Sequence, residues 1–177
     1  MVDLTDNNGD QIRSDQEYWY KIALADGREI GLGEPWKSSA NNGRTLLKVV
    51  PAGQGIVWRY QRFDGDNRPA QGWPIGDKGY LRGLQVNFDG SETIKHMSVS
   101  AGSQHRLCGY DDNNNYGLVA EQLPKHRVAL YAYNGSGNVC GLRVTADNII
   151  IAHESGHAMA LDCEFVRVST RKFIGLF

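Results

Sequence analysis

The chain has few cysteines, no excess of either sign of charge and no long apolar run, and each of these absences excludes a class of protein. Its three cysteines, Cys108, Cys140 and Cys163, are widely spaced, and an odd number leaves one disulfide at most. A disulfide framework is therefore excluded, and each thiol is expected to act as a small apolar core group. With 19 Lys and Arg against 20 Asp and Glu, the chain does not have the charge of a nucleic-acid or membrane-surface binder.

No apolar run reaches the length that spans a bilayer, and the N-terminus shows no basic and apolar signal region. We therefore expect either that a signal peptide was removed on secretion or that the protein stays in the cytosol. The 177 residues suffice for one compact domain, 1–177, with a single core. The 21 glycines and 41% hydrophobic residues indicate a globular chain with many tight turns.

Short strands separated by turns dominate the pattern. Residues 18–24 and 28–32 flank Asp26-Gly27, which is typical of a hairpin turn. In a later strand Ile56, Trp58 and Tyr60 share one face, because side chains alternate with period two. Further strands are predicted at 45–50, 55–63, 84–88, 94–99, 125–133, 142–144, 149–151 and 161–168. This spacing predicts an all-β barrel or sandwich, and three loose units, 1–63, 64–115 and 116–177, are compatible with a β-trefoil.

The strand predicted at 84–88 is expected to be half-buried. Leu84, Val86 and Phe88 alternate with Gln85 and Asn87, which places the three apolar side chains on one face. The strand should end at Asp89-Gly90.

The first turn of the chain carries the most specific signal. Asn8-Gly9 predicts a turn, because glycine adopts positive φ at little cost, and an aromatic strand with Tyr18 and Tyr20 follows. The spacing resembles the N-terminal signature of the Kunitz-type soybean trypsin inhibitor family, and the match runs through Leu4, Asp6, Asn8, Gly9, Asp10, Ile12 and Tyr18. Tyr20 departs from it, since an aliphatic residue is usual there. The resemblance implies a β-trefoil, a short-stranded barrel with a hairpin cap and pseudo-threefold symmetry.

Weaker matches extend the resemblance over most of the chain. The strand from Thr45 to Val50 resembles the family's strand with a cysteine before a Val-Val run, but Thr45 replaces that cysteine. The segments around Cys140 and from Leu161 onward resemble the segment of a later cysteine and the last strand. The family usually has two disulfides, which this chain cannot form. The resemblance implies an inhibitor of serine or cysteine proteases that is not an enzyme and needs no cofactor.

The resemblance places the inhibitory loop at residues 62–80. A loop held in a substrate-like shape loses little entropy on binding, and one side chain fills the specificity pocket of the enzyme. Three basic residues suit a trypsin-like target: Arg62 before Phe63, Lys78 before Gly79, and Arg68 before Pro69. The last is a poor scissile bond, and the choice between Arg62 and Lys78 stays open.

Other residues of this region have alternative roles. Trp73 and Pro74 form a possible contacting pair, because aromatic residues dominate interface energetics. Trp73 is equally expected as a lid over the barrel. Ser14 stands where the family often uses Asn to support the loop, and is the candidate loop support here.

A zinc-binding pattern lies near the C-terminus. His153 to His157 reads HExxH, and on a helix both imidazoles would bind Zn²⁺ with Glu154 as general base. Cys163 stands where the longer metzincin motif has its third histidine. The β-branched flanks favour strands instead, and no methionine follows Cys163 to form the Met-turn of those peptidases. A zinc peptidase is therefore kept as a third alternative.

The second alternative is a lectin-like β-trefoil that binds a glycan, because one fold hosts several functions. Exposed aromatic residues beside Asp and Asn loops would suit a sugar. The candidates are Trp36, Trp73, Tyr110 and the run from Asp111 to Asn115.

Overall fold

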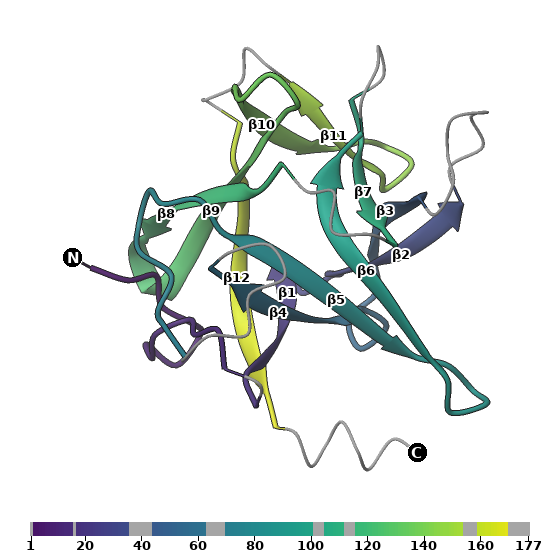
Figure 1. Ribbon diagram of the computed structural model, residues 1–177, viewed down its shortest axis with the longest axis horizontal. Coiled ribbons are helices and arrows are strands. Elements are labelled where there is room, and N and C mark those ends of the chain that lie inside the picture. The colour runs from purple at the N-terminus through teal and green to yellow at the C-terminus, as the bar shows by residue number, and fades with distance from the viewer. Residues whose placement is uncertain are drawn as a thin grey trace.

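Strands make up most of the computed structural model, which describes residues 2–15, 17–35, 44–62, 70–100, 105–111, 116–153 and 159–169. Twelve strands and one 3-10 turn lie within this part of the chain (Figure 1). They are β1 (Trp19–Leu24), β2 (Glu29–Pro35), β3 (Arg44–Val50), β4 (Val57–Gln61), β5 (Tyr80–Val86), β6 (Glu92–Val99), β7 (Leu107–Tyr110), β8 (Leu118–Leu123), η1 (Pro124–His126), β9 (Arg127–Tyr133), β10 (Val139–Val144), β11 (Ile150–His153) and β12 (Leu161–Val168). No helix in these ranges is long and apolar enough to cross a membrane.

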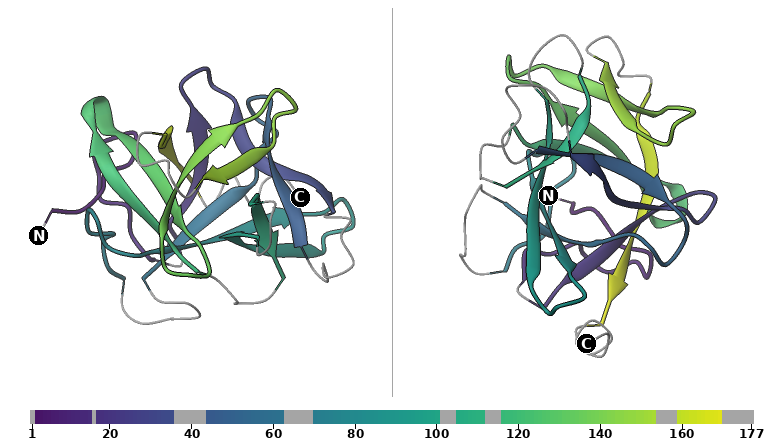
Figure 2. Two further views of the ribbon diagram at one scale, coloured as in Figure 1. Left: turned by 90° about the horizontal axis from the view of Figure 1, so that it is seen from above. Right: turned by 90° about the vertical axis from the view of Figure 1, so that its right-hand side faces the viewer.

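Six of the strands close a barrel. Neighbours pair antiparallel in the order β1, β4, β5, β8, β9, β12 and back to β1. β5 and β8 are joined by the bridge between Gly79, which directly precedes β5, and Leu118, the first residue of β8. The two views of Figure 2 show the strands arranged around the interior. Closure leaves these strands without a free edge, the usual hazard of a long sheet.

Three hairpins, β2–β3, β6–β7 and β10–β11, extend from the barrel and meet one another. β3 pairs with β7, Lys48 of β3 bridges to Ile149, and Arg106 bridges to Ile151. Each third of the fold is therefore a four-strand unit: β1–β4, β5–β8 and β9–β12. This arrangement confirms the predicted all-β fold, a β-trefoil with a hairpin cap. The predicted second boundary at 115 is wrong, since β8 belongs to the second unit.

The core follows the alternation seen in the sequence. Ile56, Trp58 and Tyr60 all lie in the main buried cluster, as predicted, with Tyr20 and Phe165 beside them. Each large apolar side chain removed from water stabilises the fold by about 1.5–3 kcal/mol. The three cysteines form no disulfide and are buried, which confirms their expected place as core groups.

The first turn is held by a buried carboxylate. Asp6 is fully buried, and its Oδ1 accepts hydrogen bonds from the backbone N–H of Asn8 (2.9 Å) and Asp10 (3.1 Å). Gly9 adopts a φ of 83°, the left-handed conformation expected of it. Leu4 and Ile12 on either side are fully buried. The predicted turn is confirmed.

The β5–β6 turn differs from its prediction. β5 ends at Val86, and Phe88 is fully exposed rather than half-buried. The N–H of Asn87 donates to the carbonyl of Ser91 (2.8 Å), and the N–H of Gly90 donates to that of Asn87 (3.0 Å). The chain therefore turns two residues before the alternation ends, and Phe88 points out from the turn.

Candidate functional site

The connection from β4 to β5 contains the predicted loop. Arg62 follows the last residue of β4 and is exposed. Phe63 and Arg68 lie outside the described residues, and the described chain resumes at residue 70. The loop therefore leaves the barrel at Arg62 and returns along 70–79 to β5.

The returning limb is bound to the N-terminal segment by main-chain hydrogen bonds. The N–H of Trp73 donates to the carbonyl of Ile12 (2.9 Å), and the N–H of Leu4 donates to the carbonyl of Trp73 (2.8 Å). The N–H of Ser14 donates to the carbonyl of Gln71 (2.9 Å). Residues 71–75 thus lie between two strand-like pieces of the first turn, and the specific N-terminal signature is the support of this limb.

Ser14 and Gln71 are linked by two hydrogen bonds at the base of the loop. The N–H of Gln71 donates to Ser14 Oγ (3.0 Å), in addition to the main-chain bond between the same two residues. The side-chain amide oxygen of Gln71 accepts a hydrogen bond from the guanidinium of Arg62. Gln71 therefore joins the departing limb, the returning limb and Ser14. Its role was not predicted, because a single glutamine in a polar loop carries no sequence signal.

Trp73 lies in the core. It is fully buried and stacks on Tyr60, with ring centroids 4.9 Å apart and planes 4° apart. Phe165 meets it edge-on at 6.1 Å, and the indole N–H donates to the carbonyl of Asp77 (3.0 Å). Of its two expected roles, burial supports the lid over the barrel and not the exposed contact. Pro74 is buried as well, so the expected contacting pair is not displayed.

The far end of the connection is anchored to β8. The N–H of Gly79 donates to the carbonyl of Leu118 (2.8 Å) and its carbonyl accepts from the N–H of Leu118 (2.7 Å). A Cβ on Gly79 would lie 2.6 Å from Cε2 of Trp73, so only glycine fits there. Lys78 is exposed, but its ammonium lies over the ring of Tyr133 in β9, 4.7 Å from the ring centroid. This is a cation–π contact with the barrel.

Two buried phenols, those of Tyr20 and Tyr60, lie beneath the loop. Burial raises the pKa of Tyr60, while the positive charge of Arg62 acts weakly in the opposite direction. Burial likewise raises the pKa of Tyr20 to about 12, although its hydroxyl accepts the N–H of Arg13 (3.1 Å). Both phenols therefore stay protonated and uncharged at neutral pH.

The zinc alternative does not fit the described residues. His153 is the last residue of strand β11 and pairs with Gly141, so this histidine lies on a strand and not on the helix that the motif requires. Glu154 and His157 lie outside the described residues. Among those described, no group of three His, Cys, Asp or Glu is placed to bind a metal.

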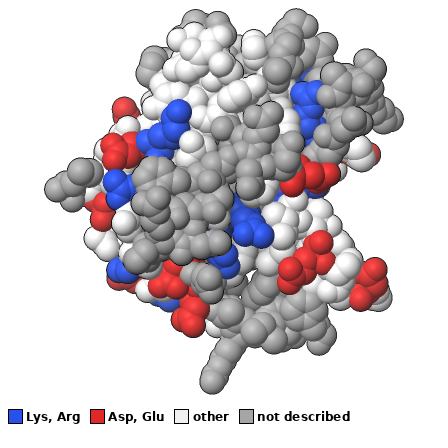
Figure 3. All heavy atoms as spheres, viewed as in Figure 1, with Lys and Arg blue, Asp and Glu red and all other residues white. Residues whose placement is uncertain are grey.

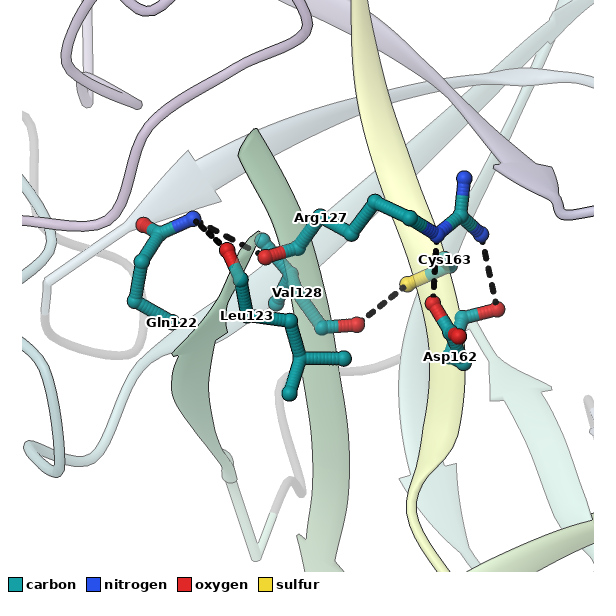
Figure 4. Close-up of polar contacts among 6 residues, drawn as sticks. All are labelled: Gln122, Leu123, Arg127, Val128, Asp162 and Cys163. Carbon is teal, nitrogen blue, oxygen red and sulfur yellow. Dashed lines mark hydrogen bonds and ion pairs between the residues drawn. The ribbon is translucent and has the colours of Figure 1, made fainter. Parts of the chain in front are cut away.

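Cys163 is also unsuited to a metal. Its Sγ lies 3.7 Å from the carbonyl oxygen of Val128, and the side chain is fully buried between β9 and β12 (Figure 4). Burial raises the pKa of this thiol to about 12, whereas a zinc ligand must be a thiolate. The charged groups beside it are already paired, since Arg127 Nε donates to Asp162 Oδ1 at 2.6 Å (Figure 4).

Two of the candidate glycan-binding residues, Tyr110 and Asp111, make contacts within the protein. The hydroxyl of Tyr110 donates to the carbonyl of Val99 (3.3 Å), and the guanidinium of Arg44 covers its ring. Asp111 forms an ion pair with Lys95. Trp36 and residues 112–115 lie outside the described residues. The structure therefore brings no sugar-binding set together in the part of the chain that it describes.

Comparison with known proteins identifies the fold. No protein-family model and no curated protein sequence matches the chain. Among solved structures, trypsin inhibitor 1 from Senna obtusifolia superposes with a TM-score of 0.66 at 15% identity, covering 97% of this chain and 92% of that one. Soybean trypsin inhibitor superposes with a TM-score of 0.64 at 11% identity, covering 94% of this chain and 100% of that one. A water-soluble chlorophyll protein from Brassica oleracea var. Botrytis superposes with a TM-score of 0.68 at 11% identity, covering 96% of this chain and 100% of that one.

These likenesses confirm the β-trefoil fold that the resemblance at the first turn implied. At this level of identity they establish the fold, and the chlorophyll protein shows that one such scaffold serves different functions. The function must therefore be argued from the side chains that the loops of this chain present, and not from the fold.

Proposed function

We propose that this protein is a protease inhibitor that presents residues 62–71 to its target. The observation that carries the proposal is the brace at the base of this loop, where Gln71 is joined to Ser14 and Arg62. Two of the structural neighbours are trypsin inhibitors by name, which agrees with this use of the scaffold. The proposal includes no catalytic step and no cofactor.

The physical basis is preorganisation of the loop. Fixing one backbone residue costs about 1–2 kcal/mol in conformational entropy, so a loop ordered before binding loses less on association. The ladder from Ser14 to Leu4 holds the returning limb, and buried Trp73 prevents the limb from lifting. The enzyme therefore meets a loop whose base is already in place.

Arg62 is the residue that we propose for the specificity pocket of a trypsin-like enzyme. It is exposed and begins the part of the chain between the two anchored limbs, next to Phe63. Its bond to Gln71 is solvent-exposed and is exchanged at little cost for a carboxylate of the enzyme. Lys78 is a poorer candidate, because Gly79 beside it is bound to β8 on both its N–H and its carbonyl.

The test is inhibition of trypsin by purified protein, with chymotrypsin, subtilisin and papain as the panel. We expect stoichiometric inhibition of trypsin, and Arg62→Ala should raise the inhibition constant at least a hundredfold because it removes the charge from the pocket. Lys78→Ala is the matched control and should change the constant by less than threefold. Loss of inhibition in Lys78→Ala but not in Arg62→Ala would overturn the assignment. A wild-type protein that inhibits none of the four enzymes would overturn the function.

A further inference from the structure

Two arginines from opposite ends of the chain meet on one tyrosine ring. The guanidinium carbon of Arg167 lies 3.7 Å from the ring centroid of Tyr18, and that of Arg13 lies 6.0 Å from the same centroid. The two positive charges are therefore separated by no more than the sum of these distances. We call Arg13, Tyr18 and Arg167 the arginine cluster.

The arginine cluster lies at the end of the barrel from which the proposed inhibitory loop departs. β4 runs antiparallel to β1 and ends at Gln61, so the loop leaves where β1 begins. β12 ends there too, because its last residue, Val168, pairs with Trp19, the first residue of β1 (Figure 1). Tyr18 and Arg167 are the chain neighbours of this pair. An enzyme that binds the loop therefore approaches the end of the barrel that carries the cluster.

Arg13 joins the cluster to the support of the loop. It forms an antiparallel bridge with Gly72 of the returning limb, and it directly precedes Ser14, whose Oγ binds Gln71. The N–H of Arg13 donates to the hydroxyl of Tyr20 (3.1 Å), which fixes the main chain at this point. The segment that holds the base of the loop therefore also carries the first arginine of the cluster.

In the described part of the chain, neither arginine of the cluster forms an ion pair. The buried carboxylate of Asp6, in the same turn as Arg13, accepts backbone N–H groups and pairs with neither arginine. Basic and acidic groups are interspersed on the face shown in Figure 3. Other cations pair with carboxylates of this chain: Lys21 with Glu29, Arg28 with Asp26, Lys95 with Asp111, and Arg127 with Asp162.

Both guanidinium groups can be contacted from outside. Arg167 is exposed and Arg13 is half-buried, and Nε of Arg13 has no hydrogen-bond partner among the described residues. The cation–π contact with Tyr18 restrains the long side chain of Arg167, so this side chain loses less freedom on binding. Arginine and tyrosine are enriched among the residues that dominate protein interfaces, and a guanidinium fork matches two oxygens of a carboxylate. The cluster therefore suits acidic side chains of another protein.

We propose that the arginine cluster is a second contact for the target enzyme and binds carboxylates on the rim of its active-site cleft. This inference rests on the proposed function, since it needs an enzyme held at residues 62–71. Charges at the rim of an interface mainly raise the rate of association, and salt screens their effect. The loop sets which specificity pocket is filled, and the cluster sets how fast an enzyme with an acidic rim is bound.

The test is the rate constant for association with trypsin, measured by stopped flow at about 10 mM and about 150 mM sodium chloride, where charges are screened over about 30 Å and about 8 Å. Anionic and cationic trypsin are compared, because they share a specificity pocket and differ in surface charge. We expect Arg13→Gln/Arg167→Gln to bind anionic trypsin about tenfold more slowly than wild type at low salt. The difference should shrink at high salt and be smaller with cationic trypsin.

Three variants serve as controls. Arg143→Gln should leave the rate unchanged, since Arg143 is an exposed residue of the β10–β11 hairpin in the cap. Arg13→Lys/Arg167→Lys keeps both charges and should retain most of the wild-type rate, because steering depends on charge. Ser14→Ala loosens the base of the loop and should weaken inhibition equally at both salt concentrations. Circular dichroism checks that each variant folds.

The outcomes separate this proposal from the proposed function. Trypsin inhibition with an unchanged association rate in folded Arg13→Gln/Arg167→Gln would overturn the second contact and leave the inhibitory loop in place. A slower rate that does not depend on salt would also overturn it, because charge would not be the cause. Wild-type protein that inhibits neither trypsin would overturn both proposals.

Discussion

The two connections that flank β5 are ordered by different means. The β5–β6 turn is held by its own residues: Asn87 Nδ2 donates to Ser91 Oγ (3.0 Å) and to Thr93 Oγ1 (2.9 Å), and Ser91 N–H donates to Asp89 Oδ1 (2.9 Å). The β4–β5 connection is held by partners far away in sequence, in the first turn, in β8 and in β12. The shape of the first turn is therefore set by local contacts, whereas that of the second connection depends on the whole fold.

The two connections also differ in which side chains they expose and which they bury. The short turn exposes Phe88 and buries nothing large, so its sequence can change at little cost to the barrel. The long connection buries Trp73 and Pro74 while leaving Arg62 and Lys78 exposed. Its buried residues belong to the core, and its exposed residues are available for binding. The predictions below test this difference, from the largest expected effect to the smallest.

Trp73→Ala should be the most destabilising of these changes. It removes the stack on Tyr60 and leaves a cavity beside Phe165, and such truncations cost about 3–5 kcal/mol in unfolding free energy. Urea unfolding followed by fluorescence measures it. Trp73→Phe keeps an aromatic ring and should cost clearly less. A loss below about 1 kcal/mol for Trp73→Ala would show that the connection is not part of the core.

Gly79→Ala should cost about 1–3 kcal/mol by overpacking, because the new methyl group would meet Trp73. Displacing the ring should also weaken trypsin inhibition. Gly53→Ala is the control: Gly53 has a φ of 87° and open space around it, so the cost is backbone strain alone, roughly 1–2 kcal/mol. Inhibition by Gly53→Ala should be unchanged. Equal inhibition by both variants would disprove the link between Gly79 and the loop.

Ser14→Ala should have a small effect on stability and a larger one on binding. It removes the Oγ that accepts the N–H of Gln71, a net loss of about 0.5–1.5 kcal/mol. The base of the loop becomes less ordered, so the inhibition constant for trypsin should rise about three- to tenfold. Ser136→Ala, in an exposed hairpin turn, should change neither quantity. An unaltered inhibition constant in Ser14→Ala would remove Ser14 from the loop support.

Phe88→Ser should leave the unfolding free energy unchanged within about 0.5 kcal/mol, because surface changes away from packed features have small effects. The side chain is fully exposed and the turn is held by other residues. Thermal and urea unfolding measure this directly. A loss above about 1 kcal/mol would mean that Phe88 packs against the protein, as the alternating sequence predicted.

The sequence predicted local features well where one short segment decides them. Asp6, Asn8 and Gly9 specify the first turn through their own side chains and backbone, and the alternation of Ile56, Trp58 and Tyr60 specifies an inward face. The same method misjudged Phe88, because the hydrogen bonds of the turn end the strand before the alternation does. It left Trp73 with two roles, since only distant ring partners decide its burial.

By itself the sequence determined most of the strands and turns and, through the resemblance of the first turn, the β-trefoil fold, because these depend on residues close together in the chain. Tertiary structure alone decided that Gln71 closes the loop base and that Arg13 and Arg167 meet on the ring of Tyr18. The physical reason is register. Which residues oppose each other across strands is set by how the whole barrel closes, and a shift of one residue would turn every side chain of a strand to the other face.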